Sequence, residues 1–214
     1  MDKFLILGER CSGSNFLEAC VLKNFNVQHK QLCHKHFFLH MKPQDFKETR
    51  VIMIIRNQND WLQSFFHTPH HVPKKNSKSW KSFLTNSWTS IINKKEMDVY
   101  KNKSFLNIFE MRSFKLRYMM FLKKKLHPNQ VVIIHYEHLK TNINKELQKI
   151  VSKFHWKPKN SIMQSIDYDV KELNHKNQLI KYKTNKYPDI PSNIITVIQK
   201  NTNWKLENYI AKLE

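Results

Sequence analysis

Only two glycines occur in the 214 residues, and they stand close together near the N-terminus. With the two residues that follow, the segment that they bound reads Gly8-Glu9-Arg10-Cys11-Ser12-Gly13-Ser14-Asn15. This G-x-x-x-x-G spacing lies between an apolar strand-like run and a helix-like run, and it is typical of turns whose backbone amides bind phosphate. The segment therefore predicts a site for a phosphorylated ligand.

The metal-binding half of a nucleoside-triphosphate loop is missing from this segment. Lysine followed by Ser or Thr would hold the β- and γ-phosphates and Mg²⁺, but Ser14 and Asn15 occupy those two positions. An acidic residue that supports Mg²⁺ would follow the apolar run 51–55, and Arg56 stands there instead. The pattern predicts phosphate binding without a metal ion.

Hydrophobic patterning predicts the elements that position these residues. Continuous apolar runs predict buried strands at 3–7, 51–55 and 131–134, with a shorter strand within 26–33. Helical spacing of apolar residues predicts, in chain order, helices at 14–24, 60–67, 79–94, 105–126, 144–154 and 192–213. The last of these is expected to break near Asn201, and the apolar face of the helix at 105–126 is expected to contain Leu106, Phe109, Phe114, Met120 and Phe121.

Buried strands that alternate with helices predict a three-layer α/β fold. We expect a central parallel sheet covered by helices on both sides, with a P-loop-like strand-turn-helix at its start, as in nucleotide kinases. A chain of this length is typical of one domain, and we predict a single domain over residues 1–214.

The loop and two later segments match a known set of motifs. Arg10-Cys11-Ser12-Gly13-Ser14-Asn15-Phe16 is similar to the form K/R-S-G-S/T-S/T followed by an aromatic or aliphatic residue. Arg56-Asn57-Gln58-Asn59-Asp60-Trp61-Leu62-Gln63-Ser64-Phe65 is similar to R-N-P-x-D-x-x-x-S-x, and Tyr136-Glu137-His138-Leu139 is a weaker match to Y-E-D-L. The chain thereby resembles the sulfotransferases that depend on 3′-phosphoadenosine 5′-phosphosulfate (PAPS). The resemblance implies transfer of a sulfuryl group from PAPS to an acceptor hydroxyl or amine.

The resemblance also implies a role for each matched residue. It places the 5′-phosphosulfate on the backbone amides of Ser12, Gly13 and Ser14, with the side chains of Ser14 and Asn15 at the helix N-terminus. It places the 3′-phosphate on Arg56 and Ser64, which are eight residues apart. Phe16 stands where many members of the family have a tryptophan that stacks on adenine; a core aromatic is the alternative for this position.

Position 11 departs from the family pattern. Many members have Lys or Arg immediately before Ser-Gly, but here Cys11 takes that place and Arg10 falls one residue earlier. We keep both residues as predicted cofactor contacts. The positive charge that the departing phosphate requires is predicted to come from Arg10 or from Lys35.

The resemblance places the catalytic base just beyond the second strand, where His36 lies. Imidazole exchanges its proton near neutral pH, which suits removal of the acceptor proton. His34, His40 and Glu9 are the alternatives. The same histidine-rich segment, with Cys33, is not expected to bind zinc, because its spacing matches no closed tetrahedral pattern.

Charge leaves two other function classes open. Lys and Arg number 37 against 17 Asp and Glu, a formal net charge of +20, but only five of these basic residues are arginine. The lysines are interpreted either as a solvated surface or as attraction for an anionic cofactor or substrate. The alternatives are a nucleotide kinase with a degenerate P-loop and a catalytically inactive, basic protein that binds nucleic acid or a host factor.

Composition also predicts the compartment. No stretch approaches about 18 consecutive apolar residues, so a membrane span is not expected, and the N-terminus does not resemble a signal peptide. The three cysteines are too few for a disulfide scaffold and odd in number. We predict a cytoplasmic enzyme that binds a small nucleotide cofactor and an acceptor that is a carbohydrate, a lipid, a tyrosine or a small metabolite.

Overall fold

The structure is a computed structural model of the chain. It describes residues 1–30, 32, 35–36, 38–89, 103–166, 171–173, 179–181 and 186–213. The chain divides into two compact units: unit 1 comprises residues 1–56, 122–186 and 214, and unit 2 comprises residues 57–121 and 187–213. Each unit is assembled from separate stretches of the chain, and the single domain over residues 1–214 stays a prediction.

Unit 1 is built on a four-stranded parallel sheet. Its strands are β1 (Asp2–Gly8), β2 (Val27–His29), β3 (Arg50–Ile55) and β4 (Val131–His135), in the order β2-β1-β3-β4. The chain moves from β1 to β2 on one side and then returns to place β3 on the other side of β1. In parallel sheets, ligands bind outside the carboxyl ends of the strands where the order reverses, which here is between β1 and β3.

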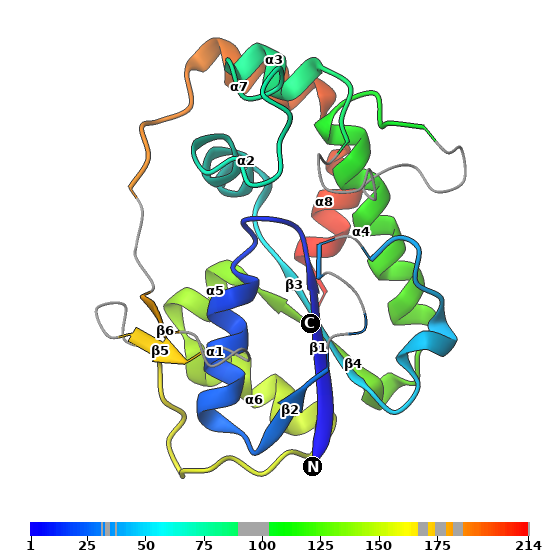
Figure 1. Cartoon of the computed structure of the whole chain (residues 1–214), viewed down its shortest axis with the longest axis vertical. Coiled ribbons are helices and arrows are strands. Elements are labelled where there is room, and N and C mark those ends of the chain that lie inside the picture. The colour runs from blue at the N-terminus through cyan, green and yellow to red at the C-terminus, as the bar shows by residue number, and fades with distance from the viewer. Residues whose placement is uncertain are drawn as a thin grey trace. The chain divides into compact units, whose positions relative to one another are not determined.

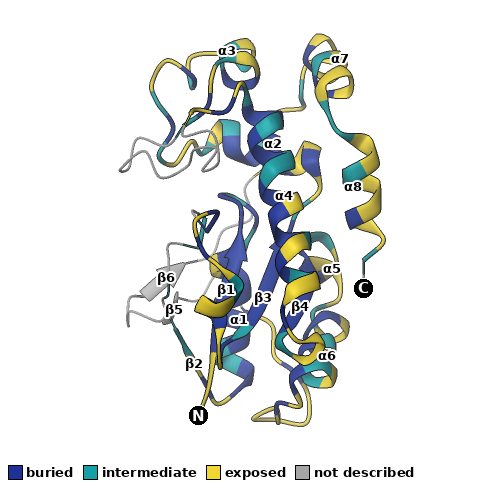
Figure 2. Cartoon of the chain, turned by 90° about the vertical axis from the view of Figure 1, so that its right-hand side faces the viewer, coloured by how far each residue is buried: buried dark blue, intermediate teal, exposed yellow. Residues whose placement is uncertain are grey.

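The sheet is buried because its strands are apolar at successive positions. Helices α1 (Ser14–Asn24), α5 (Tyr136–Thr141) and α6 (Ile143–Phe154) lie on one side of it (Figure 1). The core on that side joins sheet residues to helix residues, among them Ile6, Ile52, Ile134, Leu17, Leu147 and Ile150. Figure 2 shows buried strands and the exposed outer side of α6. The predicted α/β class is confirmed.

Unit 1 also contains short elements that patterning does not predict. They are the 3₁₀ turns η1 (Pro43–Phe46) and η2 (Pro128–Gln130) and the antiparallel pair β5 (Lys171–Leu173) and β6 (Leu179–Lys181). Three residues per strand give no periodicity to read, which is why the hairpin was not predicted.

Unit 2 is helical. It contains α2 (Gln58–His67), α3 (Trp80–Thr85), α7 (Ser192–Asn201), α8 (Trp204–Ala211) and residues 108–121 of α4 (Ile108–Lys125). Its core includes the fully buried aromatic residues Trp61, Phe65, Phe83 and Trp88. Phe65 packs edge-on against both Phe83 and Trp88 at ring distances of 5.5 Å.

The prediction of a helix at 79–94 is wrong for residues 86–89, because α3 ends at Thr85. Asn86 is extended, and Trp88 pairs with Phe105 through two backbone hydrogen bonds of 2.8 and 3.0 Å. This bridge stops the helix, because both backbone groups of Trp88 are committed to a distant segment. Residues 90–94 lie outside the described part of the chain.

The helix predicted at 105–126 is shorter and is turned differently from the prediction. It begins at Ile108, and Leu106 before it is 73% exposed. Phe121 is 42% exposed, so neither Leu106 nor Phe121 belongs to a buried face. The predicted break in the last helix is confirmed, because Thr202 is extended and Asn203 caps α8. Within the described residues, no helix has the length and apolar character needed to cross a bilayer.

Candidate cofactor site at the carboxyl edge of the sheet

The turn between β1 and α1 is wound into an anion-binding shape. Cys11 and Gly13 both have left-handed backbone angles, with φ of 60° and 90°. Such angles are found in turns that bind anions. The amide of Ser12, which lies between these two residues, donates a 3.2 Å hydrogen bond to the carbonyl oxygen of Glu9, so this predicted amide ligand is bonded inside the turn. Among the described residues, Gly13 at the N-cap has no side chain to cap α1, and no acidic residue lies in its first turn, so the first amides of the helix are open to an external acceptor.

Packing explains why both glycines are in this turn. A Cβ atom on Gly13 would overlap the ring of Tyr136, and its φ of +90° disfavours any other residue. A Cβ atom on Gly8 would lie 2.6 Å from Ile54 Cγ2 and 2.7 Å from Ser12 Oγ. The turn therefore lies directly against the ends of β3 and β4.

Arg56, which follows β3, joins the loop to the end of β4. Its Nη1 donates a 3.0 Å hydrogen bond to the carbonyl oxygen of Cys11. Its guanidinium carbon lies 4.6 Å from the centre of the Tyr136 ring. The three segments that match sulfotransferase motifs thus meet at one edge of the sheet, and Tyr136 is the residue at which they meet.

The loop after β2 closes the other side of the turn. The amide of Gly8 donates to the carbonyl oxygen of Lys35 at 3.1 Å, and Nδ1 of His36 lies 2.8 Å from the carbonyl oxygen of Gly8. The ammonium of Lys35 donates to Oδ1 of Asn15 and lies 3.5 Å from Oε2 of Glu18. Lys35 and His36 are therefore beside the start of α1.

A family model of the sulfotransferase domain matches residues 5–205 of this chain. The chain belongs to the sulfotransferase family. No curated protein matches it. The match covers residues of both units, and the parallel sheet with its flanking helices agrees with the fold of this family.

The sequence of this sulfotransferase-family chain did not predict that the site includes Glu18. Its side chain is 3% exposed, and a carboxylate is rarely buried so fully without a partner. It lies one helical turn beyond Asn15, so both α1 residues meet the Lys35 ammonium. The available sequence signal was an acidic residue three positions after Asn15, within the otherwise apolar run 16–22. This signal becomes informative only once the position of Lys35 is known.

Several predicted site residues of the sulfotransferase loop point inward. Arg10 is 2% exposed, Glu9 is 3% exposed and Ser12 is 1% exposed. The Ser12 hydroxyl has no hydrogen-bond partner among the described residues, which is an unusual state for a buried polar group. Phe16 belongs to the core cluster of unit 1, as expected for the core alternative, and its contact with adenine stays a prediction.

Four histidine, cysteine and serine positions singled out in the sequence remain: Ser64, His40, Cys33 and His34. Ser64 is buried in α2 of unit 2, where its carbonyl oxygen accepts a 3.0 Å hydrogen bond from the amide of Thr68. His40 is exposed in the loop that follows Leu39. Cys33 and His34 lie outside the described residues. Among the residues that are described, no three His, Cys, Asp or Glu side chains converge on one point.

Proposed function

We propose that this protein is a PAPS-dependent sulfotransferase that transfers the sulfuryl group to an acceptor hydroxyl or amine. The observation that carries the proposal is the meeting of the glycine turn, Arg56 and Tyr136 at the carboxyl edge of the sheet. Bound PAPS supplies the sulfuryl group, and adenosine 3′,5′-bisphosphate is the leaving group.

The residues present fit an anionic nucleotide. The first-turn amides of α1 have no side-chain cap in the described chain, and the buried Ser12 hydroxyl has no partner there. Both observations fit phosphate oxygens as the missing acceptors. In this proposal Ser12, Gly13, Ser14 and Asn15 hold the 5′-phosphosulfate, with Arg10 and Cys11 beside them in the same turn.

Arg56 is proposed to bind the 3′-phosphate; Ser64, the other predicted ligand of this phosphate, belongs to unit 2 and stays a prediction. Stacking on Tyr136 and the hydrogen bond to Cys11 fix the plane of the guanidinium before any ligand binds. A fixed guanidinium loses little conformational freedom when it binds a phosphate, which raises affinity.

His36 is proposed as the general base. A carbonyl oxygen can only accept, so the contact with Gly8 requires that Nδ1 of His36 carries the ring proton. The neutral ring then has its lone pair on Nε2, the atom that would take the acceptor proton. The backbone of Gly8 thereby selects the tautomer in which Nε2 can act as a base.

Lys35 is proposed to replace the cation that Cys11 does not provide. Its ammonium is held at the first turn of α1 by Asn15 and Glu18. A positive charge at this point would stabilise the negative charge that develops on the leaving phosphate. Arg10 is the second candidate, although its side chain is 2% exposed.

Action in the cytoplasm is part of the proposal. The chain has three cysteines, an odd number and too few for a disulfide scaffold, which is typical of proteins in a reducing compartment.

The test is the melting temperature with adenosine 3′,5′-bisphosphate, with AMP and with ATP-Mg²⁺. A ligand at one hundred times its Kd stabilises a protein by about 2.7 kcal/mol. We expect a shift that the bisphosphate produces, that Arg56→Ala removes and that the exposed control Arg117→Ala retains. An equal shift with ATP-Mg²⁺ would favour the kinase alternative. No shift, together with strongly salt-dependent nucleic-acid binding, would favour the inactive binding protein.

A further inference from the structure

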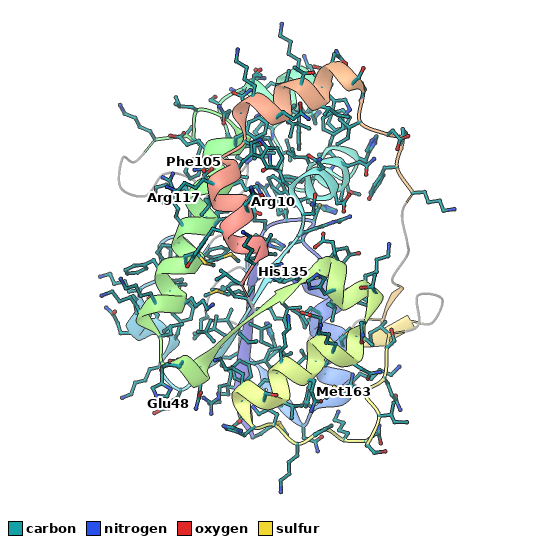
Figure 3. All side chains as sticks on the ribbon, turned by 180° about the vertical axis from the view of Figure 1, so that it is seen from behind. Arg10, Glu48, Phe105, Arg117, His135 and Met163 are labelled. Carbon is teal, nitrogen blue, oxygen red and sulfur yellow. The ribbon has the colours of Figure 1, made fainter. Side chains whose placement is uncertain are left out.

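A second pocket lies at the opposite, amino-terminal edge of the unit 1 sheet. It has a volume of about 380 Å³, and charged residues at or near the starts of β1, β3 and β4 line it. The charged residues are Asp2, Lys3, Glu48 and Arg50, and His127 lies beside them. Figure 3 shows Glu48 at the end of unit 1 that is remote from Arg10 and His135. The pocket is therefore separate from the candidate cofactor site.

We propose that this pocket binds a small zwitterion, a molecule with one ammonium group and at least one carboxylate, such as a free amino acid. The pocket presents both signs of charge, from the carboxylates of Asp2 and Glu48 and the cationic side chains of Lys3 and Arg50. A ligand with a single charge would be attracted by one group and repelled by the other.

Lys3 and Glu48 give the strongest indication. They line the same pocket with opposite charges, yet in the part of the chain that is described neither makes an ion pair or a side-chain hydrogen bond. They do not neutralise each other, so both charges are available to a ligand. The ligand carboxylate is assigned to Lys3 and the ligand ammonium to Glu48.

The rest of the wall is held in place by the protein. Nη1 of Arg50 donates to the carbonyl oxygen of Asn129 at 2.8 Å, and its guanidinium carbon lies 5.7 Å from the centre of the Phe154 ring. Oδ2 of Asp2 accepts a 2.7 Å hydrogen bond from the indole of Trp156. A preformed wall loses little entropy on binding, which favours capture of a small molecule.

Gln130 fixes the chain beneath Glu48. Its Nε2 donates to the carbonyl oxygens of Phe46 at 2.5 Å and Thr49 at 3.1 Å. These bonds tie the segment 46–49 to the residue before β4. The volume of about 380 Å³ lies in the range of about 300–1,000 Å³ that small-molecule pockets occupy. This size suits an amino acid.

The experiment is an NMR titration of the ¹⁵N-labelled full chain with L-glutamate, with glutarate and with putrescine. Glutarate has the two carboxylates of L-glutamate without the ammonium, and putrescine has two ammonium groups without a carboxylate. We expect L-glutamate to bind at least about threefold more tightly than either, which is what one added exposed ion pair provides. Equal affinity for L-glutamate and glutarate would overturn the proposal.

Two variants test separately the proposed ammonium ligand Glu48 and the proposed carboxylate ligand Lys3. Glu48→Gln should give L-glutamate and glutarate equal affinity, and Lys3→Met should weaken both by about threefold. The exposed control Lys157→Met should leave every affinity unchanged. If both pocket variants bind L-glutamate as the wild-type protein does, the proposal is wrong. The thermal shift with adenosine 3′,5′-bisphosphate should be the same in Glu48→Gln, so failure here is distinguishable from failure of the proposed function.

Discussion

The guanidinium carbon of Arg56 lies 4.6 Å from the centre of the Tyr136 ring, and the same ring lies against Gly13. One aromatic side chain from the end of β4 thus supports both the predicted 3′-phosphate ligand and the predicted 5′-phosphosulfate loop. In the proposed function the two phosphate sites would share this ring as a wall, so a change in Tyr136 should affect both.

Tyr136→Leu is expected to weaken binding of adenosine 3′,5′-bisphosphate by about twofold to thirtyfold. Loss of a cation–π contact costs about 0.5–2 kcal/mol, and the freed guanidinium must then be ordered on binding. Isothermal titration calorimetry measures the change. Tyr136→Phe keeps the ring and should bind within about twofold of the wild-type protein. Wild-type affinity in the leucine variant would show that the stacking does not position Arg56.

Gly13→Ala is expected to destabilise the protein by about 2–4 kcal/mol and to abolish bisphosphate binding. The methyl group would overlap Tyr136, and alanine is strained at a φ of +90°. Urea unfolding measures the stability. In a Tyr136→Ala background the same substitution should cost less, because only the backbone strain remains. Equal costs in the two backgrounds would contradict the contact between Gly13 and Tyr136.

Lys35→Met is expected to weaken binding of adenosine 3′,5′-bisphosphate by about tenfold, because a charge-assisted contact with the 5′-phosphate is lost. Adenosine 3′-monophosphate lacks the 5′-phosphate and should bind equally well to both proteins. Both proteins in this comparison should also carry Glu18→Gln. Without Lys35, the buried Glu18 carboxylate would itself destabilise the protein.

Cys11→Lys provides the complementary test of the same charge. If Lys35 replaces the family's loop cation, Cys11→Lys should restore most of the affinity lost in Lys35→Met and should add little to the wild-type protein. A large gain in the wild-type background would show that the cation is missing from this site rather than supplied by Lys35.

His36→Asn is expected to slow the release of sulfate from PAPS by about 10²- to 10⁴-fold, the usual contribution of a general base. The asparagine amide can still donate to the carbonyl oxygen of Gly8, so the loop should stay in place. The Kd for adenosine 3′,5′-bisphosphate should therefore remain within about twofold. An unchanged rate would assign the base to His40, His34 or Glu9.

Glu207→Ala is expected to destabilise unit 2 by about 3–5 kcal/mol. Arg112 is 1% exposed, donates to both oxygens of Glu207 at 2.6 and 2.8 Å and lies 4.6 Å from the Trp61 ring centre. Removal of the carboxylate leaves a buried guanidinium without its counter-ion. Urea unfolding followed by tryptophan fluorescence measures the loss. The exposed neighbour Lys205 serves as control, and a loss in Lys205→Ala of the same size would contradict the explanation.

Local pattern was enough to predict the chemistry-bearing segments. The strand 51–55, the helix at 144–154 and the turn between the two glycines each form from residues adjacent in sequence, so their periodicity and spacing are visible in the chain itself. The order of strands and helices predicted the parallel sheet for the same reason.

Local pattern failed where distant segments compete for the same backbone or surface. The helix predicted at 79–94 ends at Thr85 because Trp88 pairs with Phe105, and no local preference reports a partner seventeen residues away. Leu106 is apolar at a helical spacing but exposed, because the helix begins only at Ile108.

The amino-acid sequence by itself determined that a G-x-x-x-x-G turn, an arginine after a core strand and a lysine–histidine pair exist in this protein. Only the tertiary structure decided how they meet: Tyr136 between Gly13 and Arg56, and Lys35 between Asn15 and Glu18. The physical reason is that each contact joins residues from 17 to more than 100 positions apart, which the parallel sheet brings together. Their proximity arises from strand order and register, which no single segment encodes.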